Sequence, residues 1–414
     1  MQEENNKNDI QTITFGCRLN AVESEKIAKM LDNVVPRAVV VNTCAVTGEA
    51  ERQSAQYVRR VARENPNTPI FITGCAATHD ATPFEKIQNV RIIHNTDKMN
   101  VNAYIRAVTD FDFSTNTPKI CVANPDGQMS KQFIQIQNGC NHDCTYCITR
   151  LLRGPSVSFE YDDILADVRS AVKNGYGEIV LTGVDSASYH KLYDGKPFLI
   201  SDLCRKLLAD VPEICRLRLS SMDPASPEIY KIIDLMHEND RMMPHLHLSM
   251  QSGSDTILKS MRRRHSADMV RDIVARANGI SFSWDIICGF PGESDELFTE
   301  TMNLVTETKP IKIHAFPFSP RPGTAAATMP NQIQKSVAKQ RVKTITDAAI
   351  CNRVLFMNVH LGQKTSVLVE NNNTGRTPHD IPVIIIGNSI PNRTICDCKI
   401  IGIDGENLVV SCKY

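Results

Sequence analysis

Residues 135–147 read Gln-Ile-Gln-Asn-Gly-Cys-Asn-His-Asp-Cys-Thr-Tyr-Cys, and the rest of the chain is organised around them. The stretch contains Cys140, Cys144 and Cys147 in a C-x₃-C-x₂-C spacing, directly after the short apolar segment 133–136. Two cysteines separated by two residues suit zinc, whereas three close cysteines without a nearby fourth favour a [4Fe-4S] cluster. Such a cluster keeps one iron free to bind a small molecule. A zinc knuckle or three buried free thiols are the alternatives.

The composition is that of a soluble globular protein. Of 414 residues, 42% are hydrophobic and 22% charged, and the length allows two or three domains. Residues 1–11 are polar, and no apolar run reaches the length of about 18 residues that spans a membrane, so we expect a cytoplasmic protein. Basic and acidic residues balance at 46 each, which argues weakly against a DNA-coating protein. Local basic runs at 59–63 and 262–265 are either RNA contacts or solvated helix faces.

Fourteen cysteines need a physical reason in a reducing compartment. A disulfide framework is not expected there, so metal or cluster ligation is the better general explanation. Cys396 and Cys398 share one face of an expected strand, but two thiols make at most half a metal site, and we interpret them as structural. Cys121 has no partner that the sequence suggests. Four cysteines in apolar surroundings are interpreted as buried small hydrophobic residues: Cys204, Cys215, Cys351 and Cys412.

Residues 9–110 alternate between expected strands and helices. Strand patterns at 12–15, 38–41, 69–73 and 90–94 are separated by helical patterns, which predicts a small parallel sheet flanked by helices. Cys17, Cys44 and Cys75 each follow one of the first three strands. Because parallel strands end at one edge of a sheet, these three distant thiols are expected to converge and hold a second cluster. Gly16 and Gly74 would let the backbone turn tightly beside it.

The remaining chain predicts a linker and two further domains. Residues 111–130 are rich in turn formers and are expected to link the first domain to a core at 131–356. That core has six strand patterns, at 133–137, 178–182, 216–220, 245–249, 282–287 and 311–316, with helices between them, which predicts a partial (β/α)₆ barrel. Residues 357–414 contain short β-branched runs between turns and predict a small antiparallel β-barrel or sandwich, of which we expect the barrel. Such barrels either bind RNA or serve as structural caps.

The motifs together resemble those of the radical S-adenosylmethionine (SAM) methylthiotransferase family over essentially the whole chain. They are Gly16-Cys17-Arg18-Leu19-Asn20, Asn42-Thr43-Cys44, Thr73-Gly74-Cys75-Ala76, the central three-cysteine array, Leu248-Ser249-Met250-Gln251-Ser252-Gly253-Ser254, Gly289-Phe290-Pro291-Gly292-Glu293 and Ser319-Pro320-Arg321-Pro322-Gly323-Thr324. The family also has this domain order, ending in a TRAM domain. Two departures are a short interval between the first two cysteines and a second strand end, 181–184, without a Gly-Gly pair.

The resemblance implies an enzyme with two [4Fe-4S] clusters and SAM. The cluster on Cys140, Cys144 and Cys147 would bind and reductively cleave SAM, and the cluster on Cys17, Cys44 and Cys75 would carry the inserted sulfur. Polar, glycine-rich ends of four core strands suit the amino, carboxylate and ribose groups of SAM. The residues expected to contact SAM are Tyr146, Thr182, Gly183, Asp185, Ser221, Asp223, Gln251, Ser252 and Gly289.

Three branches of the family differ in substrate. One modifies isopentenyladenosine in tRNA, one threonylcarbamoyladenosine in tRNA, and one an aspartate of a ribosomal protein. The stretches 17–20 and 216–221 resemble the threonylcarbamoyladenosine branch, which implies methylthiolation at C2 of the modified adenosine 3′ of the anticodon. The expected partners are the tRNA anticodon stem-loop, contacted by the last domain and by Arg262–Arg264, an electron donor and a sulfur donor. A non-catalytic iron-sulfur or zinc protein that binds RNA is the alternative from another class.

Overall fold

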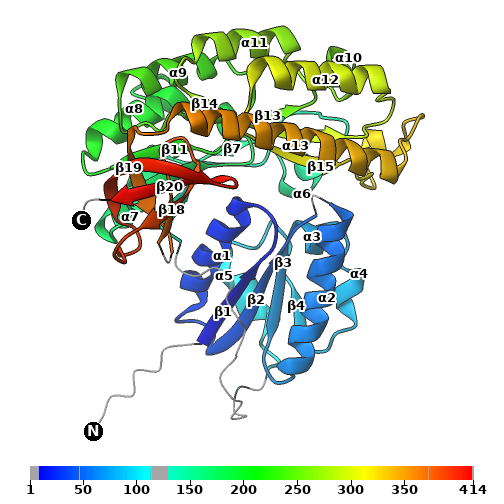
Figure 1. The fold of residues 1–414 in the computed structure, drawn as a ribbon. Coiled ribbons are helices and arrows are strands. Elements are labelled where there is room, and N and C mark those ends of the chain that lie inside the picture. Colours follow the sequence, from blue (N-terminus) through cyan, green and yellow to red (C-terminus); the bar gives the residue numbers. More distant parts are fainter. Residues whose placement is uncertain (1–8, 46, 112, 114–128, 372, 413–414) are drawn as a thin grey trace. The chain divides into compact units, whose positions relative to one another are not determined.

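The computed structural model describes residues 9–45, 47–111, 113, 129–371 and 373–412 (Figure 1). The chain forms two compact units. The first takes in residues 1–127 together with 139–141 and 147–155, and the second takes in 128–138, 142–146 and 156–414. Most of the predicted linker, with Cys121, lies outside the described residues. In the part of the chain that the structure describes, no helix has both the length and the apolar character needed to cross a membrane.

The first unit is a small parallel sheet between two layers of helices, as predicted. Its strands pair in chain order: β1 (Asp9–Thr14), β2 (Arg37–Thr43), β3 (Ile70–Gly74) and β4 (Val90–Ile92). Its helices are α1 (Arg18–Leu31), α2 (Gly48–Glu64), α3 (Cys75–His79), α4 (Thr82–Glu85) and α5 (Val101–Ala107), with α6 (Thr149–Arg153) added from the later segment.

The alternating direction of side chains along β2 explains why helices cover both faces of the sheet. Val39 and Val41 of β2 pack in a core that includes Val58 of α2, whereas Val40 packs in a second core with Ile27 of α1. Successive side chains of a strand point to opposite faces, so a fully apolar strand needs a helix on each side.

The second unit begins with six parallel strand positions. In spatial order they are β5 (Lys131–Gln135), β8 (Glu178–Thr182), β11 (Arg216–Leu219) with β12 (Ser221–Met222), β13 (His245–Gln251), β14 (Ser281–Cys288) and β15 (Lys312–Pro317). The third position is interrupted at Ser220, so β11 pairs with β8 and β12 pairs with β13. The predicted partial barrel of six strands is confirmed.

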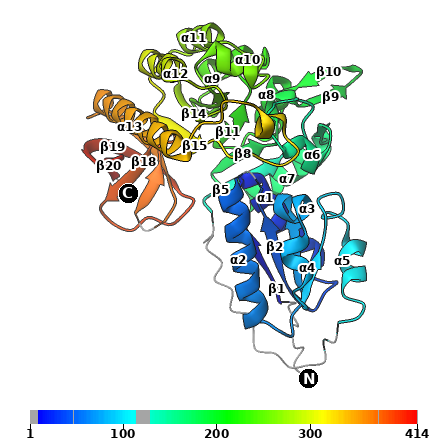
Figure 2. The same ribbon diagram turned by 90° about the vertical axis from the view of Figure 1, so that its right-hand side faces the viewer.

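Helices cover this barrel. They are α7 (Tyr161–Lys173), α8 (Ile200–Asp210), α9 (Glu228–Glu238), α10 (Asp255–Ser260), α11 (Ala267–Arg276), α12 (Asp295–Thr308) and α13 (Lys335–Val359). Two small antiparallel strand pairs were not predicted from the sequence: β6 (Gln137–Asn138) with β7 (Val157–Ser158), and the hairpin of β9 (His190–Tyr193) and β10 (Lys196–Leu199). Helix α13 leads from the core into the last domain (Figure 2).

The last domain is a closed five-stranded barrel in the order β16 (Lys364–Val369), β17 (Thr374–Arg376), β18 (Pro382–Ile386), β20 (Asn407–Cys412) and β19 (Ile395–Asp404). Its pairings are antiparallel except that β18 and β20 run parallel. The predicted small barrel is thus confirmed, with one parallel contact in it.

A buried ionic network lies between this barrel and the beginnings of the core strands. The Glu178 carboxylate is fully buried and accepts a 2.8 Å hydrogen bond from Arg218 Nε. Lys131 Nζ lies 3.3 Å from Glu178 and 3.1 Å from Asp380, so it joins the core to the barrel. Arg216 donates a 2.9 Å bond to Ser366 of β16. Charges this deeply buried persist only when they are paired, so the network fixes how the barrel docks on the core within this unit.

Candidate functional site

Cys17, Cys44 and Cys75 lie at the same edge of the first unit's sheet. Each follows the C-terminal end of one of three adjacent strands, β1, β2 and β3, and none of the three is in a disulfide. The turns carrying them touch: a Cβ at Gly16, where φ is +87°, would lie 2.5 Å from the Cys44 Cβ. The turn therefore accepts only glycine. The predicted placement at one sheet edge agrees with the structure.

These three thiols are not gathered as closely as the ligands of a single ion. Among the described residues, Cys17, Cys44 and Cys75 do not form a group whose sulfurs all lie within 4.8 Å of one another. One metal ion draws its ligands closer than that, whereas in a cubane each thiolate binds a different iron and the sulfurs stand further apart. These residues fit a [4Fe-4S] group.

A buried ion triad supports this edge. Glu23 of α1 accepts hydrogen bonds from Lys98 Nζ at 2.6 Å and from Arg153 Nη1 at 2.8 Å, and all three side chains are at most 3% exposed. Burial would raise the pKa of Glu23, but Arg153 and Lys98 together hold it below its ordinary value. Burial opposes the charge of Arg153, yet Glu23, Cys75 and Cys17 keep its pKa above the usual range. The triad places fixed positive charge beside two of the thiols.

An amide also contacts this cysteine group. Asn95 Nδ2 lies 3.8 Å from Cys75 Sγ and donates a 3.0 Å hydrogen bond to the Leu152 carbonyl of α6. Leu152 packs in a small apolar core with Ala45 and Ala76, which directly follow two of the cysteines. Residues 147–155, which end the central array and follow it, therefore pack as part of the first unit.

Cys140, Cys144 and Cys147 lie on one loop, are partly exposed and are not in a disulfide. In the second unit, Arg263 Nη1 lies 3.7 Å from Cys144 Sγ as a donor. The next residue, Thr145, is held in place because its amide donates a 3.1 Å hydrogen bond to the Met261 carbonyl. A guanidinium that donates to a sulfur can offset the negative charge of a cluster ligand, so this donor set fits a cluster.

The basic run at 262–265 is not the free RNA-binding surface that was expected. Arg263 is 7% exposed and donates to Asp223 Oδ1 at 2.9 Å, and the His265 side chain is fully buried. Arg264 is half exposed but donates to Asp223 at 2.8 Å, and Arg262 pairs with Asp143. The expectation is wrong for Arg263 and His265, because both side chains are buried and Arg263 donates to Cys144 of the cysteine loop.

Two of the carboxylates expected to contact SAM meet at His142. His142 Nε2 lies 2.7 Å from Asp185 Oδ2 and 3.7 Å from Asp223 Oδ2. Burial would raise the pKa of Asp223, but Arg263 and Arg264 hold it below its ordinary value. Asp223 therefore stays a carboxylate beside the loop.

Gln137 positions the end of β8. Its Oε1 accepts a 2.9 Å bond from the Asp185 amide, and a Cβ at Gly183 would lie 2.9 Å from the same oxygen. Gly183 is required for this close approach rather than for a Gly-Gly turn. Thr182 is 3% exposed at the end of β8, and Ser221 lies on β12.

The other predicted SAM residues lie at the ends of β13 and β14 or on the loop. Gln251 has a left-handed backbone (φ +68°), a strained state for a non-glycine residue that is typical of functional sites. Ser252 Oγ lies 3.3 Å from Thr301 Oγ1. A Cβ at Gly289 would lie 2.5 Å from Ala338 Cβ of α13, so helix packing explains this glycine. Tyr146 packs in the apolar cluster with Met261, Phe290 and others.

Sequence reasoning missed the supporting residues. Lys98, Arg153, Gln137 and His142 carry no local signal, since each acts through a partner distant in the chain. Glu23 alone offered a hint, because it is a charged residue on the buried face of an expected helix, α1.

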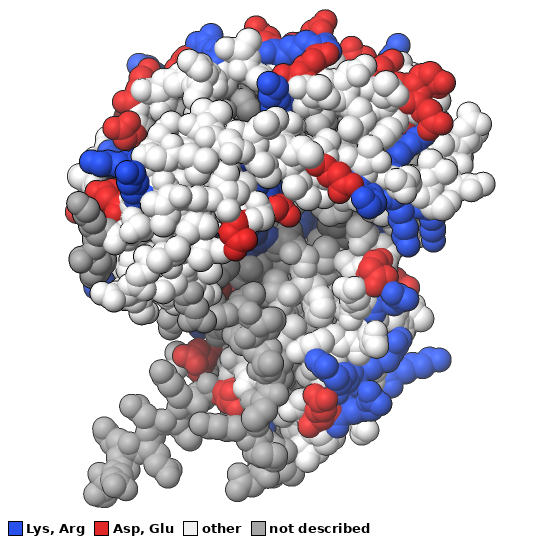
Figure 3. Space-filling model, viewed as in Figure 1, with Lys and Arg blue, Asp and Glu red and all other residues white. Residues whose placement is uncertain are grey.

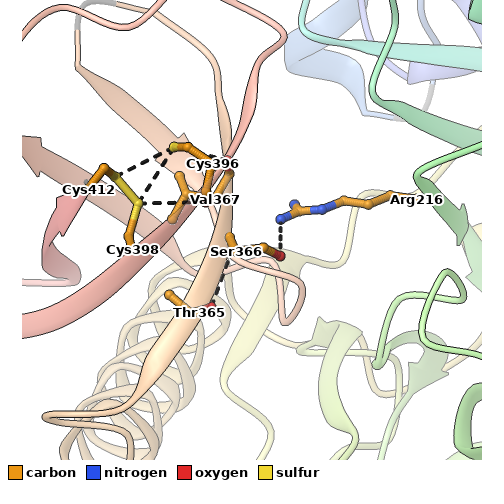
Figure 4. Close-up of a disulfide and its surroundings, with 7 residues drawn as sticks. All are labelled: Arg216, Thr365, Ser366, Val367, Cys396, Cys398 and Cys412. Carbon is orange, nitrogen blue, oxygen red and sulfur yellow. Dashed lines mark hydrogen bonds between the residues drawn. A yellow bond between two sulfur atoms is a disulfide. The ribbon is translucent and has the colours of Figure 1, made fainter. Parts of the chain in front are cut away.

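Three interpretations of other cysteines need correction. Cys204 is buried as expected, but Cys215 and Cys351 are exposed. Cys412 forms a disulfide with Cys398 (Figure 4), although no disulfide was expected. Cys412 and Cys398 face each other in adjacent strands, which brings their side chains together.

Known proteins resemble the chain in both units. The sequence matches the radical SAM superfamily over residues 134–305 and the family described as "Uncharacterized protein family UPF0004" over residues 9–94. A "Threonylcarbamoyladenosine tRNA methylthiotransferase MtaB" of Rickettsia prowazekii is 39% identical over 90% of this chain and 90% of its own length. One of the same name from Chlamydia pneumoniae is 32% identical over 97% of this chain and 98% of its own. A "tRNA-2-methylthio-N(6)-dimethylallyladenosine synthase" of Tropheryma whipplei is 32% identical over 88% and 84%.

Among solved structures, the radical SAM methyltransferase TsrM of Kitasatospora setae covers 75% of this chain and 68% of its own with a TM-score of 0.55. Its 13% identity shows a shared fold alone. The partial barrel with its three-cysteine loop defines a radical SAM enzyme, which uses SAM and a [4Fe-4S] cluster. With the first unit and these relatives, the chain belongs to the radical SAM methylthiotransferase family.

Proposed function

We propose that this enzyme inserts sulfur and a methyl group at C2 of N⁶-threonylcarbamoyladenosine, 3′ of the anticodon in tRNA. One observation carries the proposal: a second set of three cysteines outside any disulfide, Cys17, Cys44 and Cys75, follows three adjacent strands of the first unit. A radical SAM enzyme needs one cluster to cleave SAM. A second cluster site is what sulfur insertion adds, because the inserted sulfur needs a carrier.

The two thiol sets would have separate roles. Cys140, Cys144 and Cys147 would hold the cluster that, when bound, supplies the electron for SAM cleavage. Arg263 would then offset the charge on the Cys144 thiolate, and Gln137 would keep the end of β8 in place for SAM. Cys17, Cys44 and Cys75 would hold the second cluster, with the buried Arg153 balancing their negative charge.

The relatives favour the threonylcarbamoyladenosine substrate. The relative from Rickettsia prowazekii that carries this name is 39% identical, against 32% for the dimethylallyladenosine enzyme of Tropheryma whipplei. The stretches 17–20 and 216–221 also favour this substrate, because they resemble the threonylcarbamoyladenosine branch. Part of the second stretch serves the fold, however, since Arg216 and Arg218 belong to the buried network.

A basic groove on the first unit suits tRNA phosphates. It has a volume of about 520 Å³ and is lined by Arg59 and Arg63 of α2 and by Lys86 beside α4. None of these three cations forms an ion pair with another described residue, and basic side chains gather over this region in Figure 3. Unpaired exposed cations are free to contact a polyanion, which makes this groove a better phosphate site than 262–265.

Mass spectrometry of tRNA nucleosides tests the substrate. Cells with the gene should contain the 2-methylthio derivative of threonylcarbamoyladenosine, and cells without it should contain only the unthiolated nucleoside. Loss of the isopentenyladenosine derivative instead would move the enzyme to that branch. Unchanged nucleosides would reject a tRNA substrate and favour the ribosomal-protein aspartate.

Cysteine variants test the division of roles. Cys140→Ala should abolish SAM cleavage, whereas Cys44→Ala should retain SAM cleavage and abolish sulfur insertion. Cys215→Ala, at an exposed free cysteine, is the matched control and should retain both. About eight irons per chain are expected in the control and about four in each variant. Full activity of Cys44→Ala would reject the second site, and zinc without SAM cleavage would favour the non-catalytic alternative.

Binding measurements test the groove. The double variant Arg59→Ala/Arg63→Ala should bind tRNA more weakly and with a shallower dependence of log affinity on log salt, by about 0.7–0.9 per lost contact. Arg271→Ala, at an exposed arginine already paired with Glu307, should bind tRNA as the unaltered enzyme does. Equal affinity and equal slope for all three proteins would show that the groove is only a solvated face.

A further inference from the structure

Three cysteines converge inside the C-terminal barrel (Figure 4). Cys396 and Cys398 lie on β19, and Cys412 ends β20 opposite Cys398. Cys398 and Cys412 are joined as a disulfide, and the Cys396 sulfur lies 3.6 Å from that of Cys398 and 3.5 Å from that of Cys412. Sequence alone suggested only two of these thiols, which is half a metal site; the structure supplies the third.

A bulge in β19 creates this group. Near the hairpin turn, Asp404 faces Asn407, and in that register Cys412 would lie opposite Lys399. The register shifts between Ile400 and Gly402, so that Cys412 instead lies opposite Cys398. A one-residue shift moves side chains to the other face of a strand, so the bulge turns Cys412 toward the other two sulfurs.

The geometry of this group differs from that of the two cluster sets. The three sulfurs all lie within 4.8 Å of one another, which is the separation a single ion needs. Thiolates at about 2.3 Å from a tetrahedral ion stand roughly 3.8 Å apart, close to the two separations that Cys396 makes. Once the third pair is no longer bonded, the three sulfurs need little further movement to surround one ion.

We propose that the reduced barrel binds one thiophilic d¹⁰ metal ion, Zn²⁺ or Cu⁺, through Cys396, Cys398 and Cys412. A low-molecular-weight thiol of the cytoplasm first reduces the disulfide: two thiols give up two electrons and two protons, two cysteine thiols form, and the reductant leaves as its own disulfide. The ion then replaces three thiol protons, which leaves the site with a net charge of −1 for Zn²⁺ or −2 for Cu⁺. Three donors satisfy Cu⁺, whereas Zn²⁺ takes a fourth ligand such as water.

A buried cation lies beside the strand that contacts this group. Arg216 is 2% exposed and donates to Ser366 of β16, and the next residue, Val367, accepts from Cys396 Sγ through its carbonyl oxygen. The surrounding core is apolar, with Val367 and Val410 fully buried in it. An apolar shell offers no competing oxygen ligand from protein side chains, so it favours a soft ion held by sulfur.

The small size of the barrel is a reason for it to contain a stabilising crosslink. A domain of roughly 50 residues buries too little apolar surface to be firmly stable alone and commonly needs a metal or a disulfide. Cys398 and Cys412 can supply the disulfide under oxidising conditions, and all three thiols can supply the metal site under reducing conditions. The barrel would then keep a crosslink in either state.

Metal analysis of the full-length enzyme tests the proposal. The iron-loaded protein is reduced anaerobically with a thiol, incubated with Zn²⁺ in one arm and Cu⁺ in another, and freed of unbound metal. We expect one added ion per chain with iron content unchanged, and three sulfur neighbours, at about 2.3 Å for zinc, by X-ray absorption at the metal edge. The arm that retains its ion against a chelator identifies the metal.

Two variants and a control decide the result. Cys396→Ser keeps the disulfide pair and so keeps its fold under oxidising conditions, and Cys412→Ser removes the third ligand from β20. Both should lose the added ion after reduction, whereas Cys351→Ser, at an exposed free cysteine, should keep it. Equal metal in all four proteins, or metal gained only by displacing iron, would overturn the proposal.

Discussion

Replacement of Glu178 should strongly destabilise the second unit. Its carboxylate is fully buried, and although burial raises its pKa, Arg218, Lys131 and Arg216 lower it to about 2 from an ordinary 4.5. At about 1.36 kcal/mol per pKa unit, the difference between 4.5 and about 2 corresponds to roughly 3 kcal/mol of stability at neutral pH. Glu178→Gln leaves three cations without their shared anion, so we expect a loss of about 3–5 kcal/mol.

Trp284 allows this loss to be measured. It is the single tryptophan of the chain and is fully buried on β14, so its fluorescence reports unfolding of the second unit in urea. Glu238→Gln is the matched control, because Glu238 pairs with Arg205 at the surface, where both side chains are about half exposed. That change should cost less than about 1 kcal/mol.

The pH dependence gives a second check. The Glu178 carboxyl has a lower pKa when folded, so its contribution is complete above about 4.5 and is lost as the pH falls toward about 2. The unfolding free energies of the unaltered protein and of Glu178→Gln should therefore converge across that window. A Glu178→Gln protein as stable as the control at pH 7, or a gap that stays constant down to pH 2, would refute the reasoning.

Three further changes probe the thiol sites. Gly16→Ala should displace Cys44 and lower the iron content by about four per chain while SAM cleavage persists. Gly175 also has a positive φ but has open space around it, so the control Gly175→Ala should keep all the iron. Equal iron content in the two variants would contradict the close packing of Gly16 against Cys44. Glu23→Gln leaves the buried cations Lys98 and Arg153 without their anion and should lower the stability of the first unit by about 3–5 kcal/mol. Amide hydrogen exchange in β1–β3 should then be faster, and unchanged exchange rates would contradict the prediction. Arg263→Gln removes a cationic donor to a cluster ligand and should make the cluster potential more negative at unchanged iron content, and an unaltered redox titration would exclude this role.

The strand ends were predictable because their signals are local. Apolar strands that alternate with helices indicate a parallel sheet, and a cysteine directly after such a strand marks the edge where the strands end. Cys44 and Cys75 directly follow β2 and β3, as expected. The six core strands were found in the same way. The interruption at Ser220 and the two small strand pairs have no comparable periodicity in the sequence.

The basic run at 262–265 shows why side-chain roles were harder to predict. Arg263 looks like its neighbours in sequence, yet it is buried because it reaches Cys144 and Asp223, which are 119 and 40 residues away. A charge pattern along the chain does not reveal which of several arginines finds such a partner. The same holds for Cys412, whose place beside Cys396 depends on a single bulge.

Closure of the C-terminal barrel limits how it can recognise a partner. Its five strands pair all the way round, with the parallel contact between β18 and β20 completing the circle. A closed sheet has no free row of backbone amides and carbonyls, so a partner cannot bind by adding a strand to it. Whatever binds this barrel must read its outward side chains and its turns, and specificity can change there without altering the strand pairing.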